Sequence, residues 1–160
     1  MIIGIAAVDR KGAIGKRGKL PWHYSADMKF FRETTTGHAV VMGRKTWLTI
    51  GKPLKNRLNI VLSRDSNIEP QESLILLSDI ESVLSFNKSL TTDLFVIGGA
   101  QIYSAFLPHI EKWIITEVPL TVQGADAFMP KDYLEGFKAV DAKPLGDDLV
   151  VKFYNADDAD

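Results

Sequence analysis

The chain has 160 residues, of which 46% are hydrophobic and 24% charged, and its formal net charge at pH 7 is −1. This composition is that of an ordinary globular protein, and the balanced charge argues against general binding to nucleic acid or anionic lipid. The absence of cysteine excludes disulfides, thiolate nucleophiles and cysteine metal sites.

No signal peptide or membrane-spanning run is recognisable in the sequence. We therefore expect a cytoplasmic protein, without partners in the membrane or on nucleic acid. The length suits a single domain over 1–160, and we expect a monomer. Residues 156–160 are predicted to form a frayed acidic tail.

Short apolar runs alternate with helical patterns along the chain. In chain order the pattern predicts a strand over 2–8, a glycine-rich loop over 9–24, a helix over about 26–35 capped by Ser25, a strand over 39–42, a helix over 44–50, strands over 58–62 and 74–77, a helix from Ser78 or Asp79 to about 86, a strand over 94–97, a helix over 101–107, and strands over 113–118, 136–142 and 148–154.

Strands that alternate with helices predict a mostly parallel sheet. Only the segment 144–146 separates the last two predicted strands, which predicts an antiparallel hairpin at one edge. The predicted fold is a single-domain α/β fold with about eight strands in a mostly parallel sheet, an antiparallel C-terminal edge hairpin and about four flanking helices.

Residues that suggest ligand binding follow the ends of several predicted strands. They are Ala6-Ala7, the segment 43–46, Ser63-Arg64 and Gly98-Gly99. The carboxyl ends of parallel strands share one edge of a sheet, where ligands of open α/β folds bind. These segments are therefore predicted to line a single rim.

Gly98-Gly99 stands between a predicted strand and a predicted helix. Two glycines allow backbone N–H groups to approach a phosphate, although a plain tight turn explains them equally well. Arg44, Lys45 and Arg64 also follow strand ends, where they suit either a phosphate monoester or an ordinary solvated surface. A cation at a strand end, where an NAD site would place an acid, favours NADP.

Other motifs are excluded by their spacing. Gly12, Gly15 and Gly18 do not match the G-x-G-x-x-G fingerprint, and the segment 43–46 lacks the first glycine of a phosphate-binding P-loop. The three histidines are too scattered for a metal site, so no metal is predicted.

Asp27 is the most informative single residue. The dipole of the predicted helix alone would favour an acid in its first turn. However, Asp27 shares a helix side with Phe30 and Phe31, and Met28 is predicted on the same sheet-facing surface. Partial burial there would raise the pKa of the carboxyl, which then needs a hydrogen-bonding or cationic partner. Thr116 on a predicted strand is one candidate, although threonine is common in strands anyway.

An ordered set of motifs resembles the bacterial chromosomal dihydrofolate reductases. It consists of Ile5-Ala6-Ala7, Ile14-Gly15, Leu20-Pro21-Trp22, Ala26-Asp27, the segment 41–47, Leu62-Ser63-Arg64, the segment 96–103 and Asp126 within 124–130. The resemblance extends from about residue 2 to residue 130. It implies NADPH-dependent reduction of 7,8-dihydrofolate to 5,6,7,8-tetrahydrofolate, with competition by antifolates such as methotrexate and trimethoprim.

The resemblance also implies roles for individual residues. Catalytic roles fall on Asp27, Trp22, Leu20 and Thr116. The folate pocket would be lined by Ile5, Ala6, Asp27, Met28, Phe31, Ile50, Leu54, Arg57, Ile97, Tyr103 and Thr116, with Arg57 on the glutamate carboxylate. The NADPH site would comprise Ala7, Ile14, Gly15, Leu20, Gly43, Arg44, Lys45, Thr46, Leu62, Ser63, Arg64, Ile97, Gly98, Gly99, Ala100, Gln101, Ile102 and Tyr103.

By the same resemblance, the loop 9–24 would be an active-site lid, Asp126 would hydrogen-bond to it, and the peptide between Gly98 and Gly99 would be cis. Three positions depart from the family pattern. Leu20 replaces a common methionine, Gln101 a common arginine, and Ala125 is an added residue beside Asp126.

Two other functions remain open. A non-catalytic module that binds pterins or nucleotides would keep the glycine pair and Arg64, but would have no use for a buried acid. A related reductase acting on a pyrimidine, as in riboflavin synthesis, would lack the pairing of Asp27 with Arg57, which suits the ring and the carboxylate tail of folate.

Overall fold

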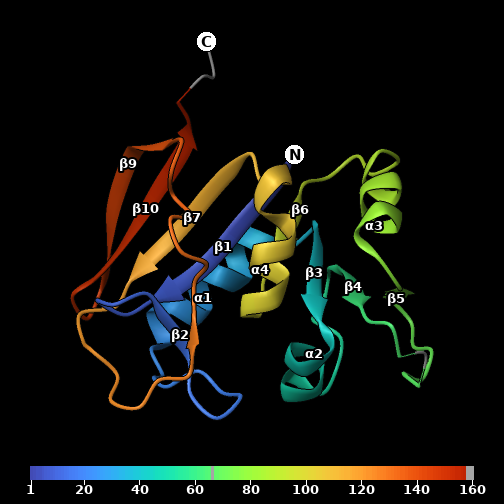
Figure 1. Cartoon of the computed structure of the whole chain (residues 1–160), viewed down its shortest axis with the longest axis horizontal. Coiled ribbons are helices and arrows are strands. Elements are labelled where there is room, and N and C mark those ends of the chain that lie inside the picture. The colour runs from blue at the N-terminus through green and yellow to red at the C-terminus, as the bar shows by residue number, and fades with distance from the viewer. Residues whose placement is uncertain (66, 158–160) are drawn as a thin grey trace.

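The computed structural model describes residues 1–65 and 67–157. Eight strands form one sheet in the order β5-β4-β3-β6-β1-β7-β10-β9 (Figure 1). They span β1 Ile2–Val8, β3 Ala39–Gly43, β4 Leu58–Leu62, β5 Leu74–Leu77, β6 Leu94–Val96, β7 Lys112–Glu117, β9 Phe137–Gly146 and β10 Leu149–Ala156. The strands from β5 to β7 are parallel, and β10 is antiparallel to both β7 and β9. The predicted fold class is confirmed.

Helices cover both faces of the sheet. They are α1 Ser25–Thr35, α2 Arg44–Ile50, α3 Ile80–Asn87 and α4 Ala100–Phe106, and a 3₁₀ turn Leu107–His109 follows α4. Alternate residues of the central strands enter two different cores, as near-continuous apolar runs predict. Val40 packs with α1 and α2 in one core, whereas Val41 packs with α3 and α4 in the other.

Two N-terminal helix caps were predicted from the local sequence, and one of the two predictions is confirmed. Asp79 caps α3 as predicted, since its side chain accepts a hydrogen bond from the Ser82 amide at 2.7 Å. The predicted cap at Ser25 is wrong. Tyr24 occupies that position with an extended backbone and makes no side-chain cap bond, so Ser25 is already helical. Asp27 remains in the first turn, where the helix dipole favours it.

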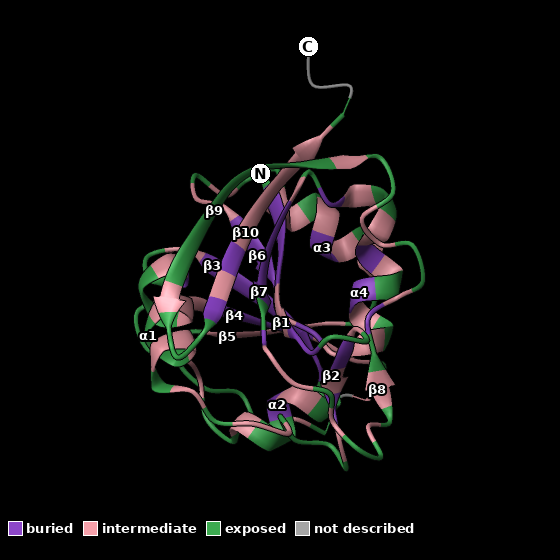
Figure 2. Cartoon of the chain, turned by 90° about the vertical axis from the view of Figure 1, so that its left-hand side faces the viewer, coloured by how far each residue is buried: buried purple, intermediate pink, exposed green. Residues whose placement is uncertain are grey.

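The C-terminal hairpin is longer than predicted, and its turn lies elsewhere. Asp147 and Asp148 have φ angles of 54° and 61°, which is the geometry of a tight two-residue hairpin turn. The predicted turn at 144–146 is wrong because Pro144 lies within β9 and pairs with Val150. An edge strand tolerates proline, and β9 is the exposed edge (Figure 2).

A second, two-stranded sheet was not predicted. It pairs β2 (Ala13–Gly15) with β8 (Ala127–Phe128), so part of the predicted loop 9–24 is a β-strand. Such short strands carry no readable periodicity. The other element boundaries agree with those predicted to within two residues, and those of β1, α2, β4 and β5 agree at both ends.

The prediction of a frayed tail is wrong for residues 156 and 157. Ala156 still belongs to β10, and the Asp157 amide donates to the Gly136 carbonyl at 2.8 Å. Residues 158–160 of that predicted tail lie outside the described residues. Within 1–65 and 67–157, no helix has the length and apolar character needed to cross a membrane.

Candidate active site

The strand ends that carry suggestive residues meet at one edge of the sheet. The strands β1, β6, β3 and β4 are parallel neighbours, with Gly4 paired to Val96 and Val96 to Val41. The Gly43 amide donates to the Gly98 carbonyl at 2.9 Å, which joins the segments that follow β3 and β6. The segments that follow these strands therefore lie at one edge of the sheet, as predicted.

Glycines allow the starts of α2 and α4 to approach each other closely. A Cβ on Gly43 would lie 2.8 Å from Ile102 Cγ1, and one on Gly98 would lie 3.2 Å from the Tyr103 ring. The Gly98-Gly99 peptide is cis, as the resemblance implied. Neither α2 nor α4 has a side-chain cap at its N-terminus. The first backbone N–H groups of both helices are thus available to an anion.

Cationic and hydroxyl side chains stand beside these helix starts. Arg44 and Lys45 open α2 and are exposed, as is Arg64 after β4. Arg44 Nη2 lies 3.4 Å from Asp65 Oδ2, and the Asp65 amide donates to Ser63 Oγ at 3.1 Å. Such a half-exposed ion pair is weak, so Arg44 can exchange it for a ligand phosphate. This donor set fits the phosphates of NADPH.

Asp27 lies in the first turn of α1. Its carboxyl is partly buried, and burial raises its pKa, whereas a hydrogen bond with the Thr116 side chain acts in the opposite direction. Thr116 is itself buried and pairs with Ala7 across β7 and β1. Two elements far apart in sequence therefore place a hydroxyl beside the acid, as predicted.

Apolar side chains from several elements cluster on the face of the sheet on which α1 packs. One cluster contains Ile5, Phe31, Ile50, Leu54 and Ile97, which come from β1, α1, α2 and the segments after α2 and β6. The expectation that Met28 faces the sheet is wrong, because its side chain is 52% exposed. The side of α1 that packs on the sheet carries Phe30 and Phe31 instead. Met28 is therefore accessible on the flank of the helix.

Comparisons with known proteins agree with this geometry. The sequence model described as "Dihydrofolate reductase" matches residues 1–154. The dihydrofolate reductase of Staphylococcus haemolyticus is 38% identical over 136 residues, which cover 85% of this chain and 80% of that protein. The dihydrofolate reductase of Haemophilus influenzae is 38% identical over 127 residues, 79% of this chain and 77% of that protein. The chain belongs to the dihydrofolate reductase family.

A solved structure supports the same assignment. The dihydrofolate reductase of Enterococcus faecalis, complexed with NADP(H) and RAB-propyl, superimposes with a TM-score of 0.91 at 29% identity, over 99% of this chain and 97% of that one. The members of this family are oxidoreductases, and NADPH is the cofactor of this chain. Among residues 1–65 and 67–157 no group of His, Asp or Glu side chains is arranged to hold a metal ion.

Arg57 is positioned by neighbours that sequence analysis did not identify. Its Nε donates to the Lys55 carbonyl at 2.8 Å and its Nη1 to Thr35 Oγ1 at 3.0 Å. Burial lowers its pKa, and the nearby positive charge of Arg32 lowers it further. A guanidinium held in this way near a second cation is suited to a carboxylate.

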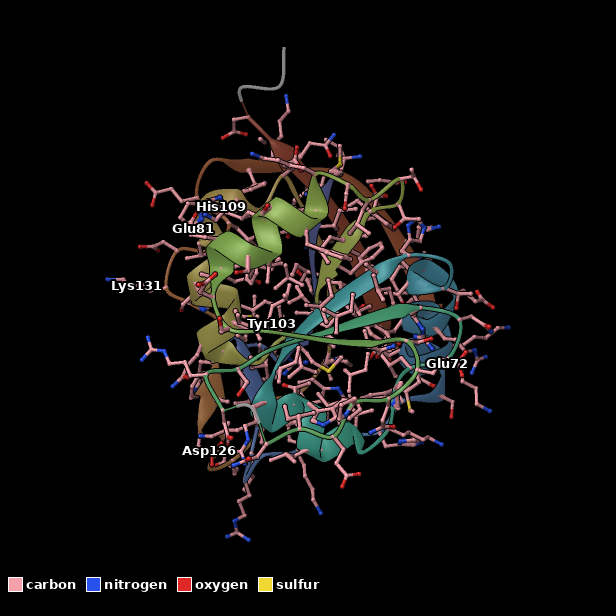
Figure 3. The ribbon with its side chains drawn as sticks, turned by 90° about the vertical axis from the view of Figure 1, so that its right-hand side faces the viewer. Glu72, Glu81, Tyr103, His109, Asp126 and Lys131 are labelled. Carbon is pink, nitrogen blue, oxygen red and sulfur yellow. The ribbon has the colours of Figure 1, made fainter. Side chains whose placement is uncertain are left out.

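Tyr103 is less accessible than its predicted ligand contacts suggest. Its ring is buried in the core beneath α4, and its hydroxyl donates to the Ile5 carbonyl at 2.7 Å. Burial raises its pKa. Figure 3 shows Tyr103 within the molecule. The structure thus gives Tyr103 a role in joining α4 to β1, while its contacts with folate and cofactor remain predictions.

The predicted lid, residues 9–24, contacts two other segments. The Arg17 amide donates to Asp126 Oδ2 at 3.0 Å, and the Asp126 amide donates to the Gly15 carbonyl at 3.1 Å. The predicted contact with Asp126 is confirmed despite the added Ala125. Asp126 lies at the lower edge of the molecule in Figure 3. Thr49 on α2, which sequence analysis missed, donates to the Gly18 carbonyl at 3.1 Å.

Two predicted lid residues differ in environment. Leu20 is 59% exposed, whereas Trp22 is half-buried. The Trp22 indole Nε1 is buried and has no hydrogen-bond partner among the described residues. An orphaned buried donor of this kind suits a polar partner supplied by water or ligand.

Proposed function

We propose that this chain reduces 7,8-dihydrofolate to 5,6,7,8-tetrahydrofolate, and that Asp27 assists protonation at pterin N5. The observation that carries the proposal is the partly buried Asp27 carboxyl with its raised pKa. Asp27 lies on α1 beside Thr116, and α1 packs through an apolar cluster on the sheet whose rim carries the glycine pair and the cations. A bicyclic ring with an amino group suits this combination of apolar walls and one acid.

The chemistry divides between cofactor and protein. Bound NADPH supplies a hydride from nicotinamide C4 to pterin C6. Asp27 would hold N3 and the 2-amino group of the pterin, with the Thr116 hydroxyl beside it. Because its pKa is raised, the carboxyl retains a proton closer to neutral pH than an exposed aspartate does. That proton reaches N5 through a water held near the Trp22 indole, which completes the reduction of the C6–N5 double bond.

The remaining residues of the proposed site would bind and orient the substrate and the cofactor. Arg57 would take the glutamate carboxylate of the folate tail, supported by its contacts with Thr35 and Lys55. The backbone around Gly98-Gly99 would hold the pyrophosphate, and Arg44, Lys45, Ser63 and Arg64 the 2′-phosphate region. Closure of the lid excludes water from the reacting atoms. The protein is proposed to act as a monomer in the cytoplasm.

The test measures loss of reduced-nicotinamide absorbance with purified protein. We expect turnover with NADPH and dihydrofolate, slower turnover with NADH, and competition by methotrexate and trimethoprim against dihydrofolate. Folded protein that binds NADPH but does not consume it with dihydrofolate would instead be a non-catalytic binding module. Turnover of a pyrimidine substrate, insensitive to methotrexate, would indicate the related reductase.

A further inference from the structure

Asp9 is a buried carboxylate that the proposed reaction does not use. It follows β1 directly and is 4% exposed. Its Oδ1 accepts hydrogen bonds from the Lys11 and Ala13 amides, each at 2.8 Å, and its Oδ2 accepts one from the Val122 amide, also at 2.8 Å. Oδ1 thus holds the start of the lid, and Oδ2 reaches across to the segment 118–126 between β7 and β8.

The lid and the segment 118–126 are joined at two places. Near the base, the Asp9–Val122 bond is reinforced by the Arg10 amide, which donates to the Leu120 carbonyl at 3.0 Å. Farther out, Asp126 accepts from the Arg17 amide at 3.0 Å and donates to Gly15. We call these the Asp9 anchor and the Asp126 anchor.

The outer part of the lid and the facing segment are not closely packed. An open cavity of about 640 Å³ is lined by Lys16, Arg17, Lys19, Leu20 and Pro21 of the lid and by Leu120, Thr121, Val122 and Gln123 of the facing segment. Side-chain packing between these two stretches is therefore incomplete. The hydrogen bonds of the two anchors hold the lid in place together with the pairing of β2 with β8 and the contact from Thr49 to Gly18.

We propose that Asp9 is a positioning residue that fixes the segment 118–126 against the lid, so that Asp126 meets the Arg17 amide. This inference rests on the proposed reductase function, because its consequence is lid closure over the cofactor. Asp9 acts through Asp126 and does not touch the reacting atoms.

Asp9→Asn tests the proposal without removing the local turn. The asparagine oxygen can still accept from Lys11 and Ala13, but its NH₂ group would face the Val122 N–H, donor against donor. The bond that crosses to the segment 118–126 is thus broken selectively. Asp9→Ala removes all three acceptor contacts and serves as the severe variant. Asp141→Asn is the matched control, because Asp141 is exposed and its carboxylate accepts a hydrogen bond from the amide of the next residue.

The decisive measurement is a double-mutant cycle with Asp126→Ala. Single-turnover hydride transfer from NADPH to dihydrofolate should slow about five- to tenfold in Asp9→Asn. In the Asp126→Ala background the same substitution should cause little further slowing, because its effect passes through Asp126. Independent, multiplicative effects would overturn the proposal, as would an Asp9→Asn protein with the parent rate and only a lower melting temperature.

Amide hydrogen exchange at Arg17 provides a readout that needs no turnover. Asp9→Asn should accelerate exchange of the Arg17 amide, and Asp141→Asn should not. An unchanged Arg17 amide would contradict the positioning role even if the protein had no reductase activity. Absence of turnover in the parent protein would overturn the reductase function alone. If Asp9→Asn has no folded population with saturating NADPH, Asp9 is a folding residue and the proposal fails.

Discussion

Two aspartates of this protein are shielded from solvent, and their environments push their pKa values in opposite directions. Asp27 is partly buried, and burial raises its pKa against a hydrogen bond with the Thr116 side chain. Asp9 is more deeply buried by exposed area, yet its pKa is lowered. Burial alone would raise it, but hydrogen bonds from the Val122, Ala13 and Lys11 amides outweigh that effect. The number of donors, rather than depth, decides the direction in which each pKa moves.

This difference matches the two uses of the side chains. A carboxylate satisfied by three amides is fixed in its charge and position, which suits an anchor. A carboxyl with a single hydroxyl partner and apolar neighbours has a raised pKa and keeps its remaining lone pairs available, which suits exchange with a substrate. Substitutions at the two sites should therefore differ in kind, and four experiments test this.

The largest effect is expected for Asp27→Asn. We expect the rate of dihydrofolate reduction near neutral pH to fall about 100- to 1,000-fold, because the carboxyl can no longer supply a proton. Steady-state and single-turnover rates measure the loss. Glu33→Gln is the matched control, since Glu33 lies on the same helix with its side chain 64% exposed. Near-parental activity of Asp27→Asn would remove Asp27 from the chemistry.

Asp9→Ala should act mainly on stability. Removing the carboxylate leaves three amides without their acceptor, which is expected to cost about 2 to 3 kcal/mol. For a chain of this size the thermal midpoint should fall by about 5 to 10 °C. Calorimetric unfolding of the variant and of Asp141→Ala measures the difference. A drop no larger than in that exposed control would show that water replaces the lost acceptor at no cost.

The pH dependence of stability should distinguish the two acids. The pKa of Asp27 is raised above its usual 3.8, so its stabilising contribution is full below that value and is lost as pH rises through the folded-state pKa. Asp27→Asn should thus be more stable than the parent at neutral pH, by about 1.4 kcal/mol for each unit by which that pKa is raised, with no such gain at low pH.

The pKa of Asp9 is lowered below 3.8. Its contribution is present above that value and is lost as pH falls through the folded-state pKa. Denaturant unfolding of the parent, Asp27→Asn and Asp9→Asn between pH 3 and pH 8 (roughly the span over which aspartates titrate in proteins) measures both trends. A stability gap between the parent and Asp27→Asn that widens toward low pH would contradict the assigned direction for Asp27.

Thr116→Val should give the smallest effect. It removes the one hydrogen bond that opposes the rise of the Asp27 pKa, with little change in side-chain volume. The pH profile of single-turnover hydride transfer should shift upward by a fraction of a unit, and the maximal rate should change about threefold or less. A downward shift would show that the threonine favours the protonated carboxyl instead.

Several features of this protein were determined by the sequence alone. Apolar runs alternating with helical patterns specify the parallel sheet, because strands buried on both faces must be apolar throughout. That sheet in turn places the segments after β1, β3, β4 and β6 on one rim. The local sequence was also sufficient to predict the Asp79 cap, because its partner Ser82 is three residues away.

Only the tertiary structure decided the features that depend on partners distant in the chain. In the sequence, Asp9 is a single acid in a basic loop. Its hydrogen-bond donor, the Val122 amide, lies 113 residues later in the chain. The hydrogen bonds from Arg57 to Thr35 and from Thr49 to Gly18 likewise join residues far apart in the chain. Met28 and Pro144 were misplaced because exposure and pairing depend on how an element packs, which the periodicity of its own residues does not contain.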